Sequence, residues 1–273
     1  MRLIKLGHRV AVIPIDPSSP ISGGSILGDK TRMTELSRSQ NAYVRASPTR
    51  CMLGGIAEHT SDVVLLCESA AYDTVIVESV GLGQSETELD QAVDIFILVI
   101  PPGAGDDLQA SKKGVMEVSD LVVVNKADGE QLQLAKQASV DYSISMRLIR
   151  RKHRDWEPKV VLVSAQTSFG IDELINSLVE FNEIMTKNNS IGEKRTRQSI
   201  YWMWAHFQKL IIDSLHSNPT LRAQTSQLKT ELELGKTSSR IAAISLYNAF
   251  ASTMKGSSNN SINFNKSEVN NNK

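Results

Sequence analysis

Residues 74–86 constrain the fold of this chain more than any other stretch. They read TVIVESVGLGQSE, a β-branched run that stops at Glu78 and breaks into Gly-x-Gly. Such a run is typical of a strand buried on both faces of a parallel sheet, and the carboxyl ends of these strands line the ligand crevice of open α/β sheets. Glu78 is therefore predicted to face a metal-bound phosphate, with Gly81, Gly83 and Gln84 in a loop that senses the terminal phosphate. For this stretch taken alone, an ordinary turn after a strand is the alternative.

Other apolar runs repeat the pattern of a strand that is followed by a polar turn. These runs cover residues 10–15, 43–45, 95–100, 121–124 and 160–163, with helical segments between them. Strands that alternate with helices predict an α/β fold with a doubly wound, mostly parallel sheet and right-handed crossovers. Asp16 follows its strand as Glu78 does, and Asp29 opens a helix, where an N-cap role is the alternative.

The sequence NKAD at residues 125–128 is the most specific signal in the chain. It follows directly on the predicted strand 121–124. A carboxylate beside a base pocket can accept hydrogen bonds from the ring N1–H and the exocyclic amino group of guanine. Adenine has no such pair of donors and would leave the carboxylate unpaired. Asp128 is therefore predicted to select guanine over adenine.

Neighbouring residues complete this predicted base site. The stem of Lys126 can lie along the plane of the base, and Asn125 can tie the loop together. The next strand ends in Ser164-Ala165-Gln166. We expect the backbone N–H groups of Ser164 and Ala165 to meet the guanine carbonyl.

Charge, hydropathy and cysteine usage disfavour several other classes of protein. Lys plus Arg and Asp plus Glu both total 30. The chain therefore has no excess of basic residues of the kind that binds nucleic acid or an anionic membrane. No apolar run approaches the length of a membrane span. Cys51 and Cys67 stand alone, and the histidines are scattered, so neither a disulfide framework nor a zinc site is expected.

The character of the chain changes after the last predicted strand. Apolar residues recur there at helical spacing on one face: Ile200, Met203, Trp204, Phe207, Leu210 and Ile211. That face is covered either by the body of the same chain or by the same helices of a second copy. We therefore expect a nucleotide-binding domain over residues 1–190, a helical arm over 191–254 and a disordered Asn/Ser-rich tail over 255–273.

Four stretches carry a combined pattern: DPSSP at residues 16–20, GGSILGDKTRM at 23–33, ESVGLGQSE at 78–86 and NKADG at 125–129. This combination resembles the MeaB/ArgK family of GTPases, and the resemblance covers residues 7–250. Ser79 and Leu82 are mild departures from the usual motif of the family in the third stretch.

The resemblance implies a GTPase that chaperones adenosylcobalamin-dependent methylmalonyl-CoA mutase, gates cofactor delivery and protects that enzyme. The implied cofactors are GTP or GDP and Mg²⁺. Asp16, Asp29 and Glu78 would surround the metal, and Glu78 and Gln84 would be the catalytic residues.

The family also implies how the protein responds to its partner and assembles. Gly81 and Gly83 would belong to one switch, and Gly103, Gly105 and Lys112 to an additional switch that responds to the mutase. The C-terminal helices would form a homodimer. The expected compartment is the mitochondrial matrix in a eukaryote and the cytoplasm in a bacterium.

One motif of the family is missing from this sequence. The chain contains no G-x-x-x-x-G-K-S/T, and its single Gly-Lys-Thr, at residues 235–237, lies between two predicted helices. In the family the phosphate loop and the first strand precede the turn at Gly7. Two interpretations stay open, an incomplete sequence of a GTPase and an interaction protein of the same fold that does not hydrolyse GTP. A nickel-insertion GTPase is disfavoured because the chain lacks a His-rich tract.

Overall fold

The computed structural model describes residues 1–16, 33–48, 59–79, 86–103 and 113–256. The chain divides into two compact units, Met1–Ser199 and Ile200–Lys273. The first unit contains all the strands of the described residues, and their pairings are all parallel.

One sheet of the first unit is built around β1 (Val10–Asp16). β1 pairs in parallel with β2 (Ala42–Val44), β3 (Ser47–Pro48) and β4 (Thr74–Glu78). The strands predicted at β1, β2 and β4 are confirmed to within a residue or two, whereas the two-residue strand β3 was not predicted.

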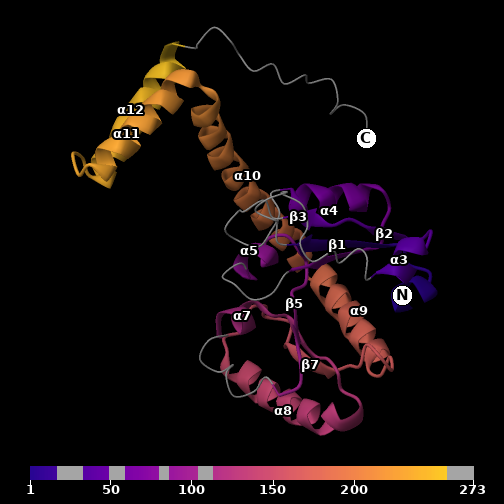
Figure 1. The fold of residues 1–273 in the computed structure, drawn as a ribbon. Coiled ribbons are helices and arrows are strands. Elements are labelled where there is room, and N and C mark those ends of the chain that lie inside the picture. The colour runs from indigo at the N-terminus through magenta and orange to yellow at the C-terminus, as the bar shows by residue number, and fades with distance from the viewer. Residues whose placement is uncertain (17–32, 49–58, 80–85, 104–112, 257–273) are drawn as a thin grey trace. The chain divides into compact units, whose positions relative to one another are not determined.

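Alternate residues of β1 pack against helices on opposite faces of this sheet. Figure 1 shows α3 and α4 beside β1. Ala11 and Ile13 pack with α4 (Thr60–Ser69), whereas Val10 and Val12 pack with α1 (Arg2–Lys5) and α3 (Thr34–Arg38). The period of two along a strand produces this division. Helices therefore cover both faces, as a doubly wound fold requires.

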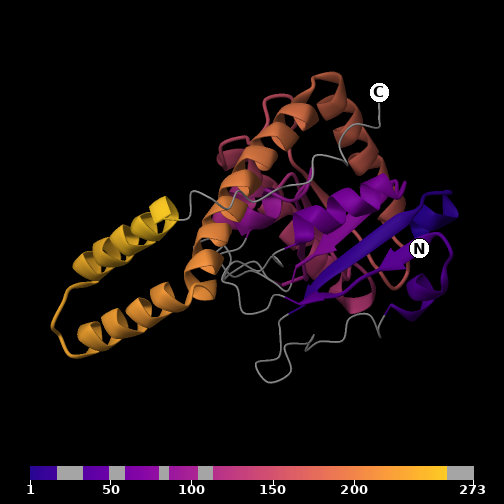
Figure 2. The same cartoon turned by 90° about the horizontal axis from the view of Figure 1, so that it is seen from above.

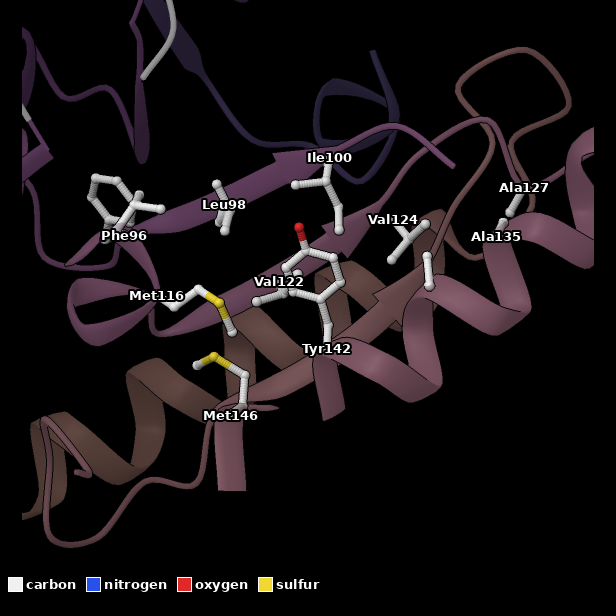
Figure 3. Packing of buried hydrophobic residues seen from close by; sticks show 12 residues of the cluster. Phe96, Leu98, Ile100, Met116, Val122, Val124, Ala127, Ala135, Tyr142 and Met146 are labelled. Atoms are coloured by element: carbon white, nitrogen blue, oxygen red, sulfur yellow. The ribbon is translucent and has the colours of Figure 1, made fainter. Parts of the chain in front are cut away.

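A second sheet has the order β5-β6-β7, with β5 (Ile97–Ile100), β6 (Leu121–Val124) and β7 (Lys159–Leu162). All four residues of the central strand β6 are buried. Its even-numbered side chains face α8 (Leu132–Leu148), from which Tyr142 and Met146 point toward the strand (Figure 3). Its odd-numbered side chains pack with α9 (Ile171–Lys187) on the other face.

The parallel α/β fold is confirmed, with one difference from the single sheet expected. Among the described residues β4 pairs with β1 alone and β5 with β6 alone, so the strands form two sheets. Ile76 on β4 is 42% exposed and Val99 on β5 is 60% exposed. Which strands pair depends on contacts between residues that are far apart in the sequence. The composition of the runs that form β4 and β5 therefore does not predict their partners.

Further short helical elements lie in the connections between these strands. They are α5 (Glu86–Asp90), α7 (Lys113–Val118) and the 3₁₀ turn η1 (Gly129–Gln131). The long helix α10 (Ser190–Ser217) begins in the first unit and ends in the second.

The second unit also contains α11 (Pro219–Glu233) and α12 (Ser239–Gly256), which pack against each other (Figure 2). The Asn218 side chain caps α11 by accepting from the backbone N–H of Thr220 at 3.0 Å. Gly235, with φ of 66°, follows its C-terminus. Asparagine at the N-cap, proline at the first helical position and glycine after the helix end are the residues that these positions favour.

A buried aspartate stabilises the N-terminal end of the second sheet. Asp120 precedes β6, and its fully buried carboxylate accepts from the backbone N–H of Phe96 and from Lys152 Nζ, both at 2.8 Å. Its second oxygen lies 3.0 Å from His153 Nε2. Burial alone would raise the pKa of Asp120, but the His153 and Lys152 contacts outweigh it and lower that pKa. The carboxylate therefore stabilises the fold in its charged form.

We predict that Asp120→Asn lowers the free energy of unfolding by roughly 3–5 kcal/mol at neutral pH, because it removes the buried negative charge that accepts from Lys152 and from the Phe96 N–H. Since the folded-state pKa is depressed, this stabilisation is present above the ordinary value of 3.8 and is lost as the pH falls through the folded-state pKa. Urea unfolding at several pH values measures both effects. Glu157→Gln is the control, because Glu157 is 60% exposed and pairs with Arg151 on the surface. Equal stability of Asp120→Asn and the control would refute the structural role.

Candidate functional site

Two loops from distant parts of the sequence meet at the carboxyl end of the second sheet. The loop that follows β6 donates from Asn125 N to Ile100 O and from Ala127 N to Val163 O, each at 2.9 Å. The register Val124↔Leu162 between β6 and β7 places the residues after both strands side by side. Backbone pairing thus holds residues 125–128 between the ends of the two outer strands.

The Asn125 side chain joins these two loops. Its Oδ1 accepts from Lys126 N at 2.8 Å and from Ala165 N at 3.2 Å. Lys126 has φ of 60°, a left-handed conformation that is uncommon for a residue with a side chain. Such conformations persist where surrounding bonds enforce them, and they concentrate at ligand sites.

Ser164 holds the Asp128 carboxylate. Its hydroxyl donates to Asp128 Oδ2 and accepts from Thr167 N at 3.1 Å. Ser164 is fully buried, so the carboxylate is held from the protein side. The backbone N–H of Ser164 is occupied, because it donates to Phe169 O at 2.9 Å. The Ala165 N–H is likewise occupied, because it donates to Asn125 Oδ1 at 3.2 Å. The expectation that these two N–H groups are available to a ligand is therefore wrong, and Ser164 contributes through its hydroxyl.

A pocket of about 510 Å³ opens beside these groups. It is lined by Asn125, Lys126, Asp128, Gly129, Glu130, Gln131, Ala165 and Gln166. The pocket is within the range of small-molecule sites. It brings together all the predicted base-site residues except Ser164, which lies behind Asp128. Gly129, Glu130 and Gln131 were not predicted, although their position directly after Asp128 is a usable signal.

Gly170 is a further requirement of the site that the sequence did not reveal. It has φ of 71°, and a Cβ built on it would lie 1.9 Å from Leu162 O. Glycine is needed because α9 begins in direct contact with the backbone of β7. The loop that carries Ser164 and Ala165 ends at this close approach.

Two predicted acids lie at the carboxyl edge of the first sheet. Asp16 ends β1 and Glu78 ends the adjacent parallel strand β4, where Glu78 is paired in register with Pro14. The Glu78 side chain is exposed. The two acids therefore come from the ends of neighbouring strands.

The remaining predicted site residues are divided between the described and the undescribed parts of the chain. Gly103 lies in the turn after β5, with φ of 77°. The others lie outside the described residues: Asp29, Gly81, Gly83, Gln84, Gly105 and Lys112.

Among the residues that the structure does describe, no group of three or more His, Cys, Asp or Glu side chains could hold a metal ion. Within those same residues, no helix has the length and apolarity needed to cross a membrane.

Known proteins resemble this chain over most of its length. The mouse protein named "Methylmalonic aciduria type A homolog, mitochondrial" is 41% identical over 250 residues, which are 92% of this chain and 60% of that protein. "GTPase ArgK" of Escherichia coli is 44% identical over 218 residues, covering 80% of this chain and 66% of that protein. The chain thus spans somewhat less than two thirds of the length of these relatives.

A solved structure and a family pattern agree with these relatives. The crystal structure of an LAO/AO transport system kinase superposes with a TM-score of 0.65 at 31% identity, covering 92% of this chain and 74% of that one. Residues 1–220 match the family described as "Methylmalonyl Co-A mutase-associated GTPase MeaB". The protein therefore belongs to the MeaB family of methylmalonyl-CoA mutase-associated GTPases.

Proposed function

We propose that this chain provides the guanine-binding part of a GTPase that acts on adenosylcobalamin-dependent methylmalonyl-CoA mutase. The observation that carries the proposal is the Asp128 carboxylate, held by the buried Ser164 hydroxyl at the wall of the 510 Å³ pocket. In this role the protein would gate delivery of the cobalamin cofactor and protect the mutase.

Guanine selectivity follows from the hydrogen-bonding capacity of that carboxylate. Ser164 occupies one side of Asp128, and the carboxylate keeps further lone pairs for the N1–H and amino group of guanine. Hydrogen bonds to a charged acceptor contribute about 1.5–3 kcal/mol each. Adenine would leave the same acceptor unpaired, so ATP is disfavoured.

The residues of the first-sheet edge have the chemistry that Mg²⁺ prefers. Asp16 and Glu78 would hold the ion through carboxylate oxygens, and Asp29 is the third proposed ligand. Mg²⁺ bound there would neutralise phosphate charge. Glu78 and Gln84 are proposed to act at the terminal phosphate, Gly81 and Gly83 to form its switch, and Gly103, Gly105 and Lys112 to form the switch that responds to the mutase.

A protein that binds the mutase without hydrolysing GTP is the second candidate. The observation in its favour is that the sequence contains no G-x-x-x-x-G-K-S/T, and phosphate and metal contacts supply much of the stabilisation in phosphoryl transfer. GTP turnover by the full-length gene product distinguishes the two candidates.

The mouse relative is named as mitochondrial, and we propose the same compartment if the organism is a eukaryote.

The helical arm is proposed to form a homodimer. Trp204 and Phe207 are 55% and 51% exposed, and their rings meet edge to face with centroids 5.9 Å apart. Three other residues of the predicted face are exposed as well, Ile200, Met203 and Leu210, whereas Ile211 is half-buried. Contiguous apolar surface of this kind marks interaction sites, and twofold symmetry lets the same surface meet itself.

Asp128→Asn is expected to weaken GDP binding by roughly 100-fold or more, because two hydrogen bonds to a charged acceptor are lost. Asparagine can donate to the second carbonyl of xanthine, so the variant is expected to prefer the xanthine nucleotide. Calorimetric titration of the full-length gene product with GDP, XDP and ADP measures this change. Asp141→Asn on α8 is the control and is expected to retain the selectivity of the unmodified protein. Unchanged selectivity in Asp128→Asn would exclude its base-reading role.

The double variant Trp204→Ala, Phe207→Ala is expected to behave as a folded monomer in analytical ultracentrifugation. Loss of an interface anchor costs about 2 kcal/mol or more, which is roughly 30-fold in Kd for each aromatic. The control is Val140→Ala, Ile144→Ala on α8, where both side chains are also more than half exposed. It should leave the assembly intact. A double variant that stays dimeric would place the interface elsewhere, and one that unfolds would show that the face packs within its own chain.

A further inference from the structure

The short helix α5 lies between β4 and β5 in the chain. It follows directly on residues 79–85, which carry Gln84, and those residues follow Glu78 at the end of β4. With five residues, α5 is too short to be stable alone. Its position therefore depends on its contacts with the rest of the first unit.

Asp90, the last residue of α5, is held by the beginning of α10. Its Oδ1 accepts from Lys194 Nζ at 2.7 Å, and its backbone carbonyl accepts from Gln198 Nε2 at 2.9 Å. The same two side chains reach further along the chain, to the carbonyls of Asp94 at 3.0 Å and Val93 at 2.8 Å. Two side chains one helical turn apart thus fix the whole segment 90–94.

These contacts are buried rather than superficial. Asp90, Lys194 and Gln198 are at most 9% exposed. Burial lowers the pKa of Lys194, and the nearby Lys152 lowers it further, while Asp90 opposes both effects. The charge on Lys194 is therefore tolerated because Asp90 is in place. A displacement of Asp90 would leave an unpaired charge in the interior, so α5 and α10 are not free to move independently.

Ion pairs of the neighbouring residue Arg195 hold the same turn of α10. Arg195 donates through Nε and Nη2 to both oxygens of Asp94, at 2.8 and 2.6 Å, and through Nη2 to Glu68 on α4 at 2.7 Å. Paired contacts of this kind define orientation as well as distance. The start of α10 is consequently tied both to α5 and to a helix that covers the first sheet.

We infer that Asp90 couples the proposed nucleotide site to α10 through α5, the helix that follows Glu78 and Gln84 in the sequence. Asp90, Lys194 and Gln198 are positioning residues, which act through α5 and segment 90–94. The inference rests on the proposed GTP binding. It adds that a change of nucleotide at that site alters the stability of α10 at residues 190–199, outside the nucleotide site. The same helix continues without interruption to Ser217, through Trp204 and Phe207.

Hydrogen–deuterium exchange of the full-length gene product tests this coupling. Peptides over residues 86–94 and 190–199 are compared with GDP and with a non-hydrolysable GTP analogue bound. In the unmodified protein both peptides are expected to change their exchange rate between the two nucleotides, by about tenfold or more. Calorimetry in the same samples reports nucleotide binding itself.

Lys194→Met tests the coupling while the Asp90 carboxylate keeps a charged partner. Lys152 Nζ also donates to Asp90 Oδ1, at 2.8 Å, so the carboxylate keeps a partner when Lys194 is removed. The variant is expected to bind GDP with unchanged affinity and to confine the nucleotide response to residues 86–94. Arg197→Met is the control, because Arg197 is 65% exposed and lies 3.9 Å from Glu193. It should keep the response at 190–199.

The possible outcomes distinguish this inference from the proposed function. Gln198→Met changes no charge and is expected to give the same result if Lys194→Met does not fold. Nucleotide binding without a response at 190–199 in the unmodified protein would overturn the coupling and leave the proposed function intact. A response that persists in both Lys194→Met and Gln198→Met would also overturn it. Absence of nucleotide binding would overturn both the proposed function and the coupling that rests on it.

Discussion

The parallel pairing of β6 with β7 is the constraint on which the candidate site depends. It aligns two strand ends that are 38 residues apart, Val124 and Leu162, and so places the two following loops side by side. Once the loops are adjacent, Asn125 joins them through two backbone donors, and Ser164 donates to Asp128. The bond from Ala165 to Asn125 and the bond from Ser164 to Asp128 cannot form within one loop alone. The chemistry of the site is thus a consequence of the sheet.

Local sequence predicted much of this arrangement. The β-branched run at residues 121–124 became the fully buried central strand of the second sheet, because such side chains favour a strand covered on both faces. The polar residues after it could be assigned to the ligand edge because parallel strands share one carboxyl edge. Asp16 and Glu78 were assigned to the same edge of the first sheet for the same reason, and their strands are adjacent.

The features that sequence did not predict depend on non-local contacts. The contact of Gly170 with Leu162 is set by how α9 packs on β7, and the use of the Ser164 N–H by Phe169 is set by the loop that results. Lys194 and Gln198 fall among polar residues of a long helix, which predicts a solvated face. They are buried because Asp90, about a hundred residues earlier, supplies a carboxylate and a carbonyl at the point where α10 begins.

The central claim is that Asp128 reads the amino face of guanine, and nucleotide analogues test it without any mutation. Inosine diphosphate keeps the N1–H and the carbonyl of guanine but lacks the exocyclic amino group. Calorimetric titration of the full-length gene product should give a Kd for IDP that is roughly 10–100 times that for GDP, since one hydrogen bond to a charged acceptor is lost. ADP should bind more weakly still. Equal affinity for GDP and IDP would contradict the assignment of Asp128 as the guanine reader.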